Sequence, residues 1–402
     1  MYSPKASRKH FDIYIKIFAV TMVGIIACVG LPETGLTAGN SDEVKLSEGL
    51  HQGLNYLLSL VGQENSVDQT INIELIAPVL EFVASDKPDK TKESMDESFD
   101  MPSAYHEFEF EKDLNSILRF SFNPSIPSYI TTPSSVRLAT WAGTNGKDME
   151  FPDFAKLLKR LDNPIVVRGV ETLENTPDIF TGGYYKYDLE RTILLLKFEG
   201  KPVLISLSKQ KEPSDVGKKG VVLGSDDDWN YLYSGVKGLN KTGLGWVNSY
   251  MYDSYSIIVY YETAPEKPLV RCGAFKWLQA GWKKINMVKP EHISRGLQRF
   301  ASTYKSIIEN PSLPDADKIA EACRRISDLD LNTLKNINQN YLSALKKRYA
   351  EDKSLSAKWV AGLFEDHAYV DSMNRDELQS VLVIEYLKRA LGKPYEIDIE
   401  KL

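Results

Sequence analysis

The hydrophobic positions of residues 42–84 repeat with the period of an α-helix. Seven apolar side chains fall on one helical face, and the stretch 71–83 repeats the pattern. The seven are Val44, Leu46, Leu50, Leu54, Leu57, Leu58 and Val61. This pattern predicts a helical hairpin over residues 42–84.

A polar, proline-bracketed stretch follows the hairpin. Residues 85–102 (SDKPDKTKESMDESFDMP) carry charges of both signs and almost no large apolar side chain. Such a composition cannot bury enough apolar surface to order itself, so a disordered linker is expected at 85–102.

The period changes to that of β-strands over residues 103–310. Val203, Ile205 and Leu207 alternate with smaller residues, and a turn at Gly200–Pro202 joins them to the apolar run 193–198. Further strand candidates lie at 165–167, 184–187, 255–261 and 269–272. The segments between them are too short for parallel crossovers, so a mainly antiparallel α+β domain is predicted over 103–310.

Helical periodicity returns after Pro290 and continues into a C-terminal helical region, 311–402. One stripe runs from Ile293 to Ile307, and another from Leu331 to Leu345. A third helix has Asn374 as its N-cap and Glu377 three residues later. The expected fold class is therefore α+β, with a mainly antiparallel sheet flanked by an N-terminal helical hairpin and C-terminal helices.

The first forty residues resemble an export signal. Basic residues up to Lys16 precede the uncharged apolar stretch 17–31, and a small residue, Ala38, follows a helix-breaking proline. Residues 31–35 spell LPETG, the sorting motif of wall-anchored proteins. That motif acts near a C-terminus and before an apolar stretch, whereas here the apolar stretch precedes it. Residues 1–38 are therefore predicted to be a signal peptide.

Three ways of processing this segment remain open. Cleavage after Ala38 is favoured. Residues 25–28 resemble a lipobox, which would lipidate Cys28, and an uncleaved anchor is the third alternative, although 17–31 is short for a spanning helix. In each case the chain is expected to be exported to the periplasm or outer envelope.

The net charge and the cysteines narrow the possible functions and the expected covalent structure further. The 402 residues carry a formal charge of −6, which argues against nucleic-acid binding because that relies on basic surface. Cys272 and Cys323 form an even pair in an oxidising compartment. They are expected either to form a disulfide or to stay as two buried thiols.

Catalytic motifs do not emerge from the sequence. There is no G-x-S-x-G, H-E-x-x-H or C-x-x-C, and the segment 217–220 lacks the spacing of a phosphate-binding loop. Beyond the signal segment the histidines are His51, His106, His292 and His367, and no pattern joins them to a nucleophile. No cofactor is expected.

One acidic turn has the spacing of a calcium loop. Asp226, Asp228 and Asn230 occupy alternate positions, as the first ligands of an EF-hand do. The sixth position is Tyr231 and the twelfth is Lys237, where that loop needs Gly and Glu. An Asp-rich turn is the favoured interpretation, and calcium is the weaker one.

Aromatic residues crowd the strand region. Tyrosine and tryptophan suit the lining of a ligand site, but they also suit the surface of any half-buried sheet, which is the favoured interpretation. The candidate ligand-binding residues are Tyr184, Tyr185, Tyr187, Trp246, Tyr252, Tyr255 and Trp277.

The order of parts from about 105 to 310 resembles the START or helix-grip lipid-binding superfamily. The resemblance rests on the stretch 269–308, LVRCGAFKWLQAGWKKINMVKPEHISRGLQRFASTYKSII, a last strand, a tryptophan-containing connector and a long amphipathic helix. It implies a curved antiparallel sheet that grips the helix around an apolar cavity. It carries over no functional residue, because cavity-lining side chains in that superfamily share no consensus.

The leading hypothesis is a non-catalytic exported bacterial envelope protein that binds a lipid, another hydrophobic ligand or an envelope partner protein. The alternatives are a structural or assembly protein that acts through its helices, and an unrecognised hydrolase. A fold resemblance alone does not establish function.

Overall fold

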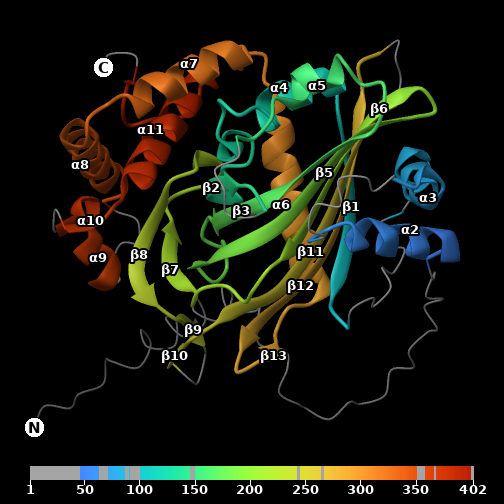
Figure 1. The fold of residues 1–402 in the computed structure, drawn as a ribbon. Helices are drawn as coiled ribbons and strands as arrows, with labels where there is room; N and C mark the ends of the chain where they lie inside the picture. Colours follow the sequence, from blue (N-terminus) through green and yellow to red (C-terminus); the bar gives the residue numbers. More distant parts are fainter. Residues whose placement is uncertain are drawn as a thin grey trace, which may run out of the picture. The chain divides into compact units, whose positions relative to one another are not determined.

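The computed structural model describes residues 46–62, 71–86, 90, 100–144, 150–241, 245–263, 267–350, 358–365 and 368–399. Within these residues the fold is α+β with an eight-stranded antiparallel sheet, so the predicted fold class is confirmed. Figure 1 shows the sheet with helices on both sides. The predicted signal peptide, the LPETG string and Cys28 lie outside the described residues.

The large sheet has the strand order β1-β12-β11-β6-β5-β3-β2, and β13 pairs with β12. Its strands are β1 (Ser103–Phe110), β2 (Val136–Ala142), β3 (Ile165–Asn175), β5 (Lys186–Phe198), β6 (Lys201–Gln210), β11 (Tyr250–Glu262), β12 (Val270–Trp282) and β13 (Ile285–Asn286). The predicted hairpin of β5 and β6 is present, with Glu199 and Gly200 in left-handed conformations at the turn.

Two smaller sheets lie beside this one. One has the order β4-β7-β8 and the other pairs β9 with β10. Their strands are β4 (Gly183–Tyr184), β7 (Lys218–Val222), β8 (Tyr231–Lys237), β9 (Leu239–Lys241) and β10 (Gly245–Val247). The periodicity of the sequence indicates only the first of these strands.

The described helices begin with the predicted N-terminal pair, α2 (Glu48–Ser59) and α3 (Ile73–Ala84), which pack on each other. Those in the middle of the chain are α4 (Leu114–Ser121), η2 (Ser128–Ile130), α5 (Phe154–Leu158), η3 (Asp226–Asp228) and α6 (Pro290–Ile308). The C-terminal ones are α7 (Ala316–Ser327), α8 (Leu331–Arg348), α9 (Lys358–Glu365), α10 (Ala368–Asp371) and α11 (Arg375–Ala390). None of the described helices is long and apolar enough to cross a membrane.

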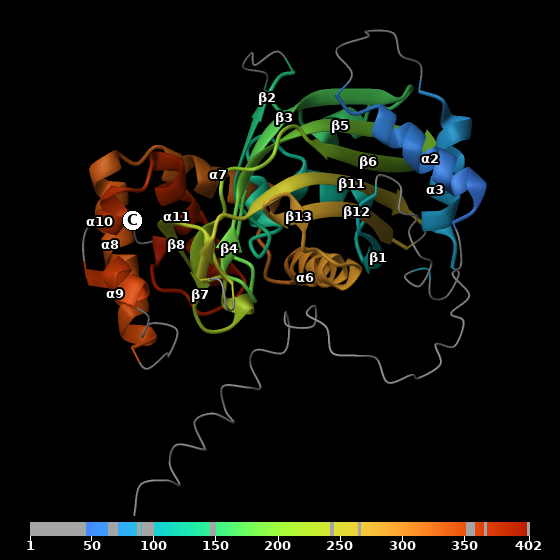
Figure 2. The ribbon, with the colours of Figure 1, turned by 90° about the horizontal axis from the view of Figure 1, so that it is seen from below.

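Both faces of the large sheet are covered. On β6 and β11, Val203, Ile205 and Ile257 point to one face and pack under α2 and α3. Leu204 and Tyr260 point to the other face and pack with α4, α5 and α6. The alternation follows from the two-residue period of a strand. Figure 2 shows α6 on the opposite side of the sheet from α2.

The long helix α6 follows β12 and β13 directly and packs chiefly on β1 and β12. Its residues Tyr304 and Ile308 are buried against Phe110 of β1. Nearer the start of the helix, Arg299 donates to the two oxygens of the Asp226 carboxylate at 2.5 and 2.7 Å, and this ion pair connects α6 to η3. The helix therefore lies along the β1 edge of the sheet and reaches β11 through Tyr304, whose ring centre is 6.4 Å from that of Tyr260.

The C-terminal helices share a core with the sheet β4-β7-β8 and with η2. We call these elements together the C-terminal module. Leu334 of α8 and Leu382 of α11 are buried in one apolar cluster with Ile130 of η2 and Leu232 of β8. At the centre of this module the buried Lys388 donates to Glu385 at 2.5 Å and to Asn230 at 2.6 Å. These helices thus pack against segments that precede residue 310.

The end of α3 is held on the sheet by two buried cations. Arg271 of β12 donates to the carbonyl oxygens of Ala84 and Ser85 at 2.8 and 2.9 Å, and to the Glu109 carboxylate at 2.7 Å. Lys90 is buried and pairs with Glu107 at 2.8 Å, so this residue of the expected disordered linker is fixed on the sheet. Residues 87–89 and 91–99 of that linker lie outside the described residues.

Replacing Arg271 by Met should loosen α3 from the sheet. Glu109 and the last carbonyls of α3 would lose their donor, and we expect a loss of about 3 kcal/mol in the free energy of unfolding. Denaturant unfolding measures that loss, and hydrogen exchange over residues 73–84 localises it. The control is Arg324→Met, since Arg324 forms only exposed ion pairs, whose loss costs about 0.5 kcal/mol. Equal losses in the two variants would contradict this account.

Candidate functional site

A line of polar side chains crosses the middle of the large sheet on the face that carries α6. Arg191 of β5, Ser208 of β6, Ser256 of β11 and Lys276 of β12 are direct cross-strand partners in register. On the opposite face the neighbouring cross-strand line is Thr192, Leu207, Ile257, Phe275 and Tyr105, which is mostly apolar and packs under α2 and α3. The polar character therefore belongs to one face only.

Hydrogen bonds link these side chains and their neighbours. The hydroxyls of Ser208 and Ser256 are 2.6 Å apart, and Lys276 Nζ donates to Ser254 Oγ at 2.5 Å. Arg191 donates through Nη2 to Ser206 Oγ and through Nη1 to Glu171, both at 2.5 Å. We call this set the polar patch; its members are Glu171, Arg191, Ser206, Ser208, Ser254, Ser256 and Lys276.

The same face turns apolar toward α4. One step along the strands, Ser206, Ile258 and Ala274 stand side by side in register. Beyond them come the apolar residues of the core that contains Tyr260 and Tyr304. Ile258 is partly exposed although it lies on a central strand, and its two neighbours, Ser206 and Ala274, have small side chains. The face thus runs from a polar end to an apolar end, and the partly exposed Ile258 lies between them.

Lys276 carries the least compensated charge of the polar patch. Burial lowers its pKa to about 8, against the opposing effect of Asp253, which raises it. Among the described residues its ammonium group has Ser254 as hydrogen-bond partner and no carboxylate within salt-bridge distance. Arg191, in contrast, is neutralised by Glu171. The polar patch therefore keeps one excess positive charge.

Donor capacity in the polar patch is also incomplete. The buried Nε of Arg191 has no hydrogen-bond partner among the described residues. An ammonium group can donate three hydrogen bonds, and Lys276 uses one of them within the described chain. Buried polar groups are nearly always satisfied in native proteins, so the Nε of Arg191 is an exception within the polar patch, whereas the partly exposed Lys276 keeps donors that can face solvent.

One of the predicted ligand-binding tyrosines belongs to this face. Tyr187 of β5 points to the same side as Arg191, and burial together with the nearby Glu171 carboxylate raises its pKa. Tyr184 is buried, donates to the Ser234 carbonyl at 2.6 Å and packs edge-on against Tyr233. The hydroxyl of Tyr185 lies 3.1 Å from that of Ser249. The contacts of Tyr184 and Tyr185 are therefore structural contacts in and beside the sheet β4-β7-β8.

The remaining aromatic candidates do not gather with Tyr187. Trp277 and Tyr255 point to the face under α2 and α3, and Trp277 is 1% exposed there. The hydroxyl of Tyr252 accepts from the backbone N–H of Lys284 at 2.8 Å. Trp246 lies on β10, and its side chain is outside the described part. The predicted set thus spans both faces of the sheet and is not one site.

The acidic turn does not converge on a cation. Asp226 binds Arg299, whereas the Asn230 side chain is buried against Lys388 and Tyr349. Asp226 and Asp228 lie on η3, and no group of three potential metal ligands occurs among the described residues. The preferred interpretation as an Asp-rich turn fits this arrangement, and the weaker calcium interpretation does not.

The expected disulfide is absent. Cys272 and Cys323 are free thiols in different cores: Cys272 is buried between the sheet and α6, and Cys323 packs in the C-terminal module. The alternative of two free thiols is therefore the one that the structure has. Burial raises the pKa of both thiols.

The described histidines serve other roles. His106 stacks on Phe108, and burial lowers its pKa. His292 accepts from the backbone N–H of Lys289 at the start of α6. The Nε2 of His51 lies 2.8 Å from the Asn55 amide on the exposed side of α2. His367 lies outside the described residues.

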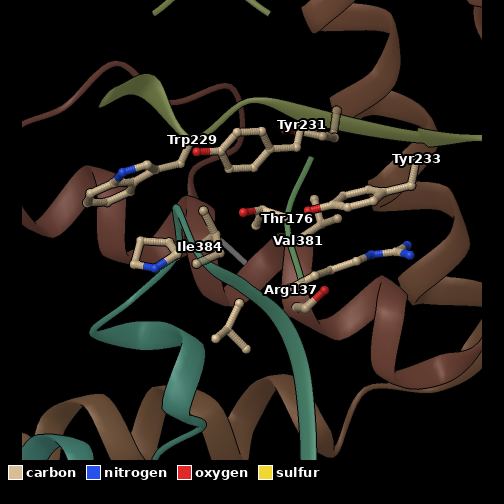
Figure 3. Close-up of a pocket in the computed structure, with 11 residues that line it drawn as sticks. Arg137, Thr176, Trp229, Tyr231, Tyr233, Val381 and Ile384 are labelled. Atoms are coloured by element: carbon tan, nitrogen blue, oxygen red, sulfur yellow. The ribbon is translucent and has the colours of Figure 1, made fainter. Parts of the chain in front are cut away.

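A second candidate is a cavity in the C-terminal module, shown in Figure 3. Its volume is about 40 Å³, which holds a few water molecules but no larger ligand. The guanidinium of Arg137 lies 3.7 Å from the Tyr233 ring centre and pairs with Glu174 and Glu377. Because these contacts neutralise Arg137 and join β2 to α11, this cavity is a structural feature.

The polar patch could have been detected only in part from the sequence. Ser206 and Ser208 alternate with Val203, Ile205 and Leu207, and this alternation indicates a polar side of one strand. Arg191 and Lys276 give no such signal, because their meeting depends on the register of four strands. Comparison with protein-family models, curated proteins and solved structures found no match to this chain.

The pKa of Lys276 predicts how stability depends on pH. At pH 7 the ammonium is charged in both states, so folding buries a charge. Between pH 8 and the ordinary lysine pKa the folded state is neutral while the unfolded state still binds the proton, so stability rises with pH. In Lys276→Met this rise is absent.

The measurement compares urea unfolding of the two proteins at pH 7 and pH 10. The stability of Lys276→Met relative to wild type should fall by on the order of 2 kcal/mol over that interval, after allowance for partial exposure. The exposed Lys318→Met serves as the matched control, with a constant difference from wild type. A constant difference for Lys276→Met as well would contradict the burial of its charge.

Proposed function

We propose that this chain is a non-catalytic binding protein that holds an amphiphilic molecule on the α6-side face of its sheet. The observation that carries the proposal is the line Arg191–Ser208–Ser256–Lys276, which places an incompletely satisfied cationic patch in the middle of a covered sheet. An anionic head would bind at Lys276, and an apolar body would lie along Ile258 toward α4.

Energetic reasoning supports a ligand over a purely structural role. A sheet that only has to pack against helices is stabilised by about 1.5–3 kcal/mol for each buried Leu- or Ile-sized side chain. Serines and a partly buried lysine forgo that gain, and the charge of Lys276 costs further desolvation energy. Binding of an acceptor-bearing ligand offsets both costs.

The proposal includes the expected export to the cell envelope, which rests on residues 1–38. It retains the helix-grip resemblance as a prediction: β12, its connector and α6 are the parts on which the resemblance rests. The two alternatives receive no specific support from the described residues. The exposed apolar side chains of the helices α3 and α8, Leu75 and Leu331, are scattered, and the described histidines do not meet a pair of carboxylates.

A fluorescent fatty acid, cis-parinaric acid, tests the proposal directly. It combines a carboxylate with an apolar chain, and we expect saturable binding to the purified protein. Lys276→Met should weaken binding by roughly tenfold, the typical effect of losing one charge-assisted hydrogen bond. Affinity for wild type should also fall as the pH rises above about 8, because Lys276 then loses its charge.

Lys318→Met is the control and should bind as wild type does. Lys276→Gln serves as a second variant that keeps a hydrogen-bond donor but no charge. Its affinity for the fatty acid should lie between those of Lys276→Met and wild type. Saturable binding that is equal in Lys276→Met and wild type would move the ligand away from the polar patch. Absence of binding to either protein would reject a fatty acid as a representative ligand.

A further inference from the structure

The tip of the β12–β13 hairpin has an unusual composition for a turn. The two strands are joined by two residues, Lys283 and Lys284, with φ angles of +51° and +63°. Positive φ at both positions defines the turn type that prefers Asn-Gly, because other L-residues are strained there. Two lysines in these positions carry backbone strain and hold two ammonium groups at the end of the hairpin.

Apolar side chains surround these lysines. Ile285, directly after the turn, is 61% exposed, and Met287 is 39% exposed. Trp282, directly before the turn, has the Lys283 ammonium 4.7 Å from its ring centre. We call this segment the basic tip; it comprises Trp282, Lys283, Lys284, Ile285, Met287 and Lys289.

A second exposed apolar pair lies beside the same end of α6. Phe180 is 57% exposed and Ile179 is 46% exposed, in the loop between β3 and β4. The Arg295 guanidinium, in the second turn of α6, lies 4.8 Å from the Phe180 ring centre. Because the basic tip leads directly into Pro290 at the start of α6 and Phe180 lies against Arg295, both apolar groups lie near the first two turns of this helix.

The stretch that forms the basic tip is positive although the whole chain is acidic, and the nearest acidic residues in sequence are Glu291 of α6 and Asp178 before Ile179. The stretch GWKKINMVKP, residues 281–290, contains three lysines and no acidic residue. Lys283, Lys284 and Lys289 are exposed, and none of them has a carboxylate partner among the described residues. Exposed Ile285 and Phe180, with a partly exposed Trp282 and lysines that have no carboxylate partner, form a composition that binds at a lipid–water interface, where aromatic rings and lysines lie at the headgroups.

We propose that the basic tip, with Phe180 and Ile179, docks on the surface of an anionic lipid bilayer. The lysines contact the headgroups, and Ile285 and Phe180 enter the boundary with the acyl chains. This inference does not require the ligand proposed for the polar patch.

Co-sedimentation with vesicles of phosphatidylcholine, with and without phosphatidylglycerol, tests the docking. The full chain is used throughout, so any contribution of the apolar stretch 17–31 is the same in every variant. Wild type should bind the anionic vesicles more tightly, and added salt should weaken that binding. The double variant Lys283→Gln/Lys284→Gln should bind anionic vesicles roughly 30-fold more weakly, given the usual effect of one lysine near such a surface.

Matched variants separate the tip from general surface effects. Lys346→Gln/Lys347→Gln removes two exposed lysines of α8, and Leu331→Ser removes an exposed apolar residue there. Both should bind as wild type does, whereas Ile285→Ser should bind roughly tenfold more weakly. Hydrogen exchange over residues 281–289 should slow on anionic vesicles.

Equal vesicle binding by wild type, the tip lysine variant and Ile285→Ser would overturn the proposal and leave a protein partner as the occupant of this surface. Lys276→Met should keep full vesicle binding, so that a failure of the polar patch and a failure of the tip give different results.

Discussion

A β-sheet that is covered on both faces has to be apolar on both faces, because every strand alternates its side chains between them. The strands β5, β6 and β11 meet this requirement at the end near α4, where Leu195, Leu204 and Tyr260 face one side and Leu196, Val203 and Tyr261 the other. Burial on the two sides makes the register unambiguous, since a slip of one residue would exchange the two sets. The positions of the other side chains on these strands, including those of the polar patch, depend on that register.

The polar patch follows from the same register. Once Leu204 and Tyr260 are aligned under α4, the strand period brings Arg191, Ser208, Ser256 and Lys276 into one line on the same face. A partly buried ammonium and unsatisfied donors lower the free energy of unfolding, and the well-packed remainder of the sheet offsets this loss. Departures from local consistency of this kind are expected at functional sites, and this one occurs beside the partly exposed Ile258 of β11.

Much of the fold could be predicted from the sequence, and the candidate site only in part. The hairpin of β5 and β6 and the helix capped by Asn374 rest on local signals, a tight turn and a capping box, and both are present. The aromatic residues were grouped by composition, which ignores direction: Tyr187 and Trp277 point to opposite faces. The distance between Cys272 and Cys323, and the meeting of Arg191 with Glu171, depend on tertiary packing that no local pattern encodes. The packing of the C-terminal module could not be predicted either, because its core joins η2 and β8 to helices that come much later in the chain.

The most direct test of the central claim is native mass spectrometry of the protein purified from its own cell envelope, in parallel with Lys276→Met. The polar patch as a binding site predicts that wild type retains an anionic amphiphile of defined mass and that the variant loses it. A bare polypeptide mass for wild type, or the same adduct on both proteins, would contradict it.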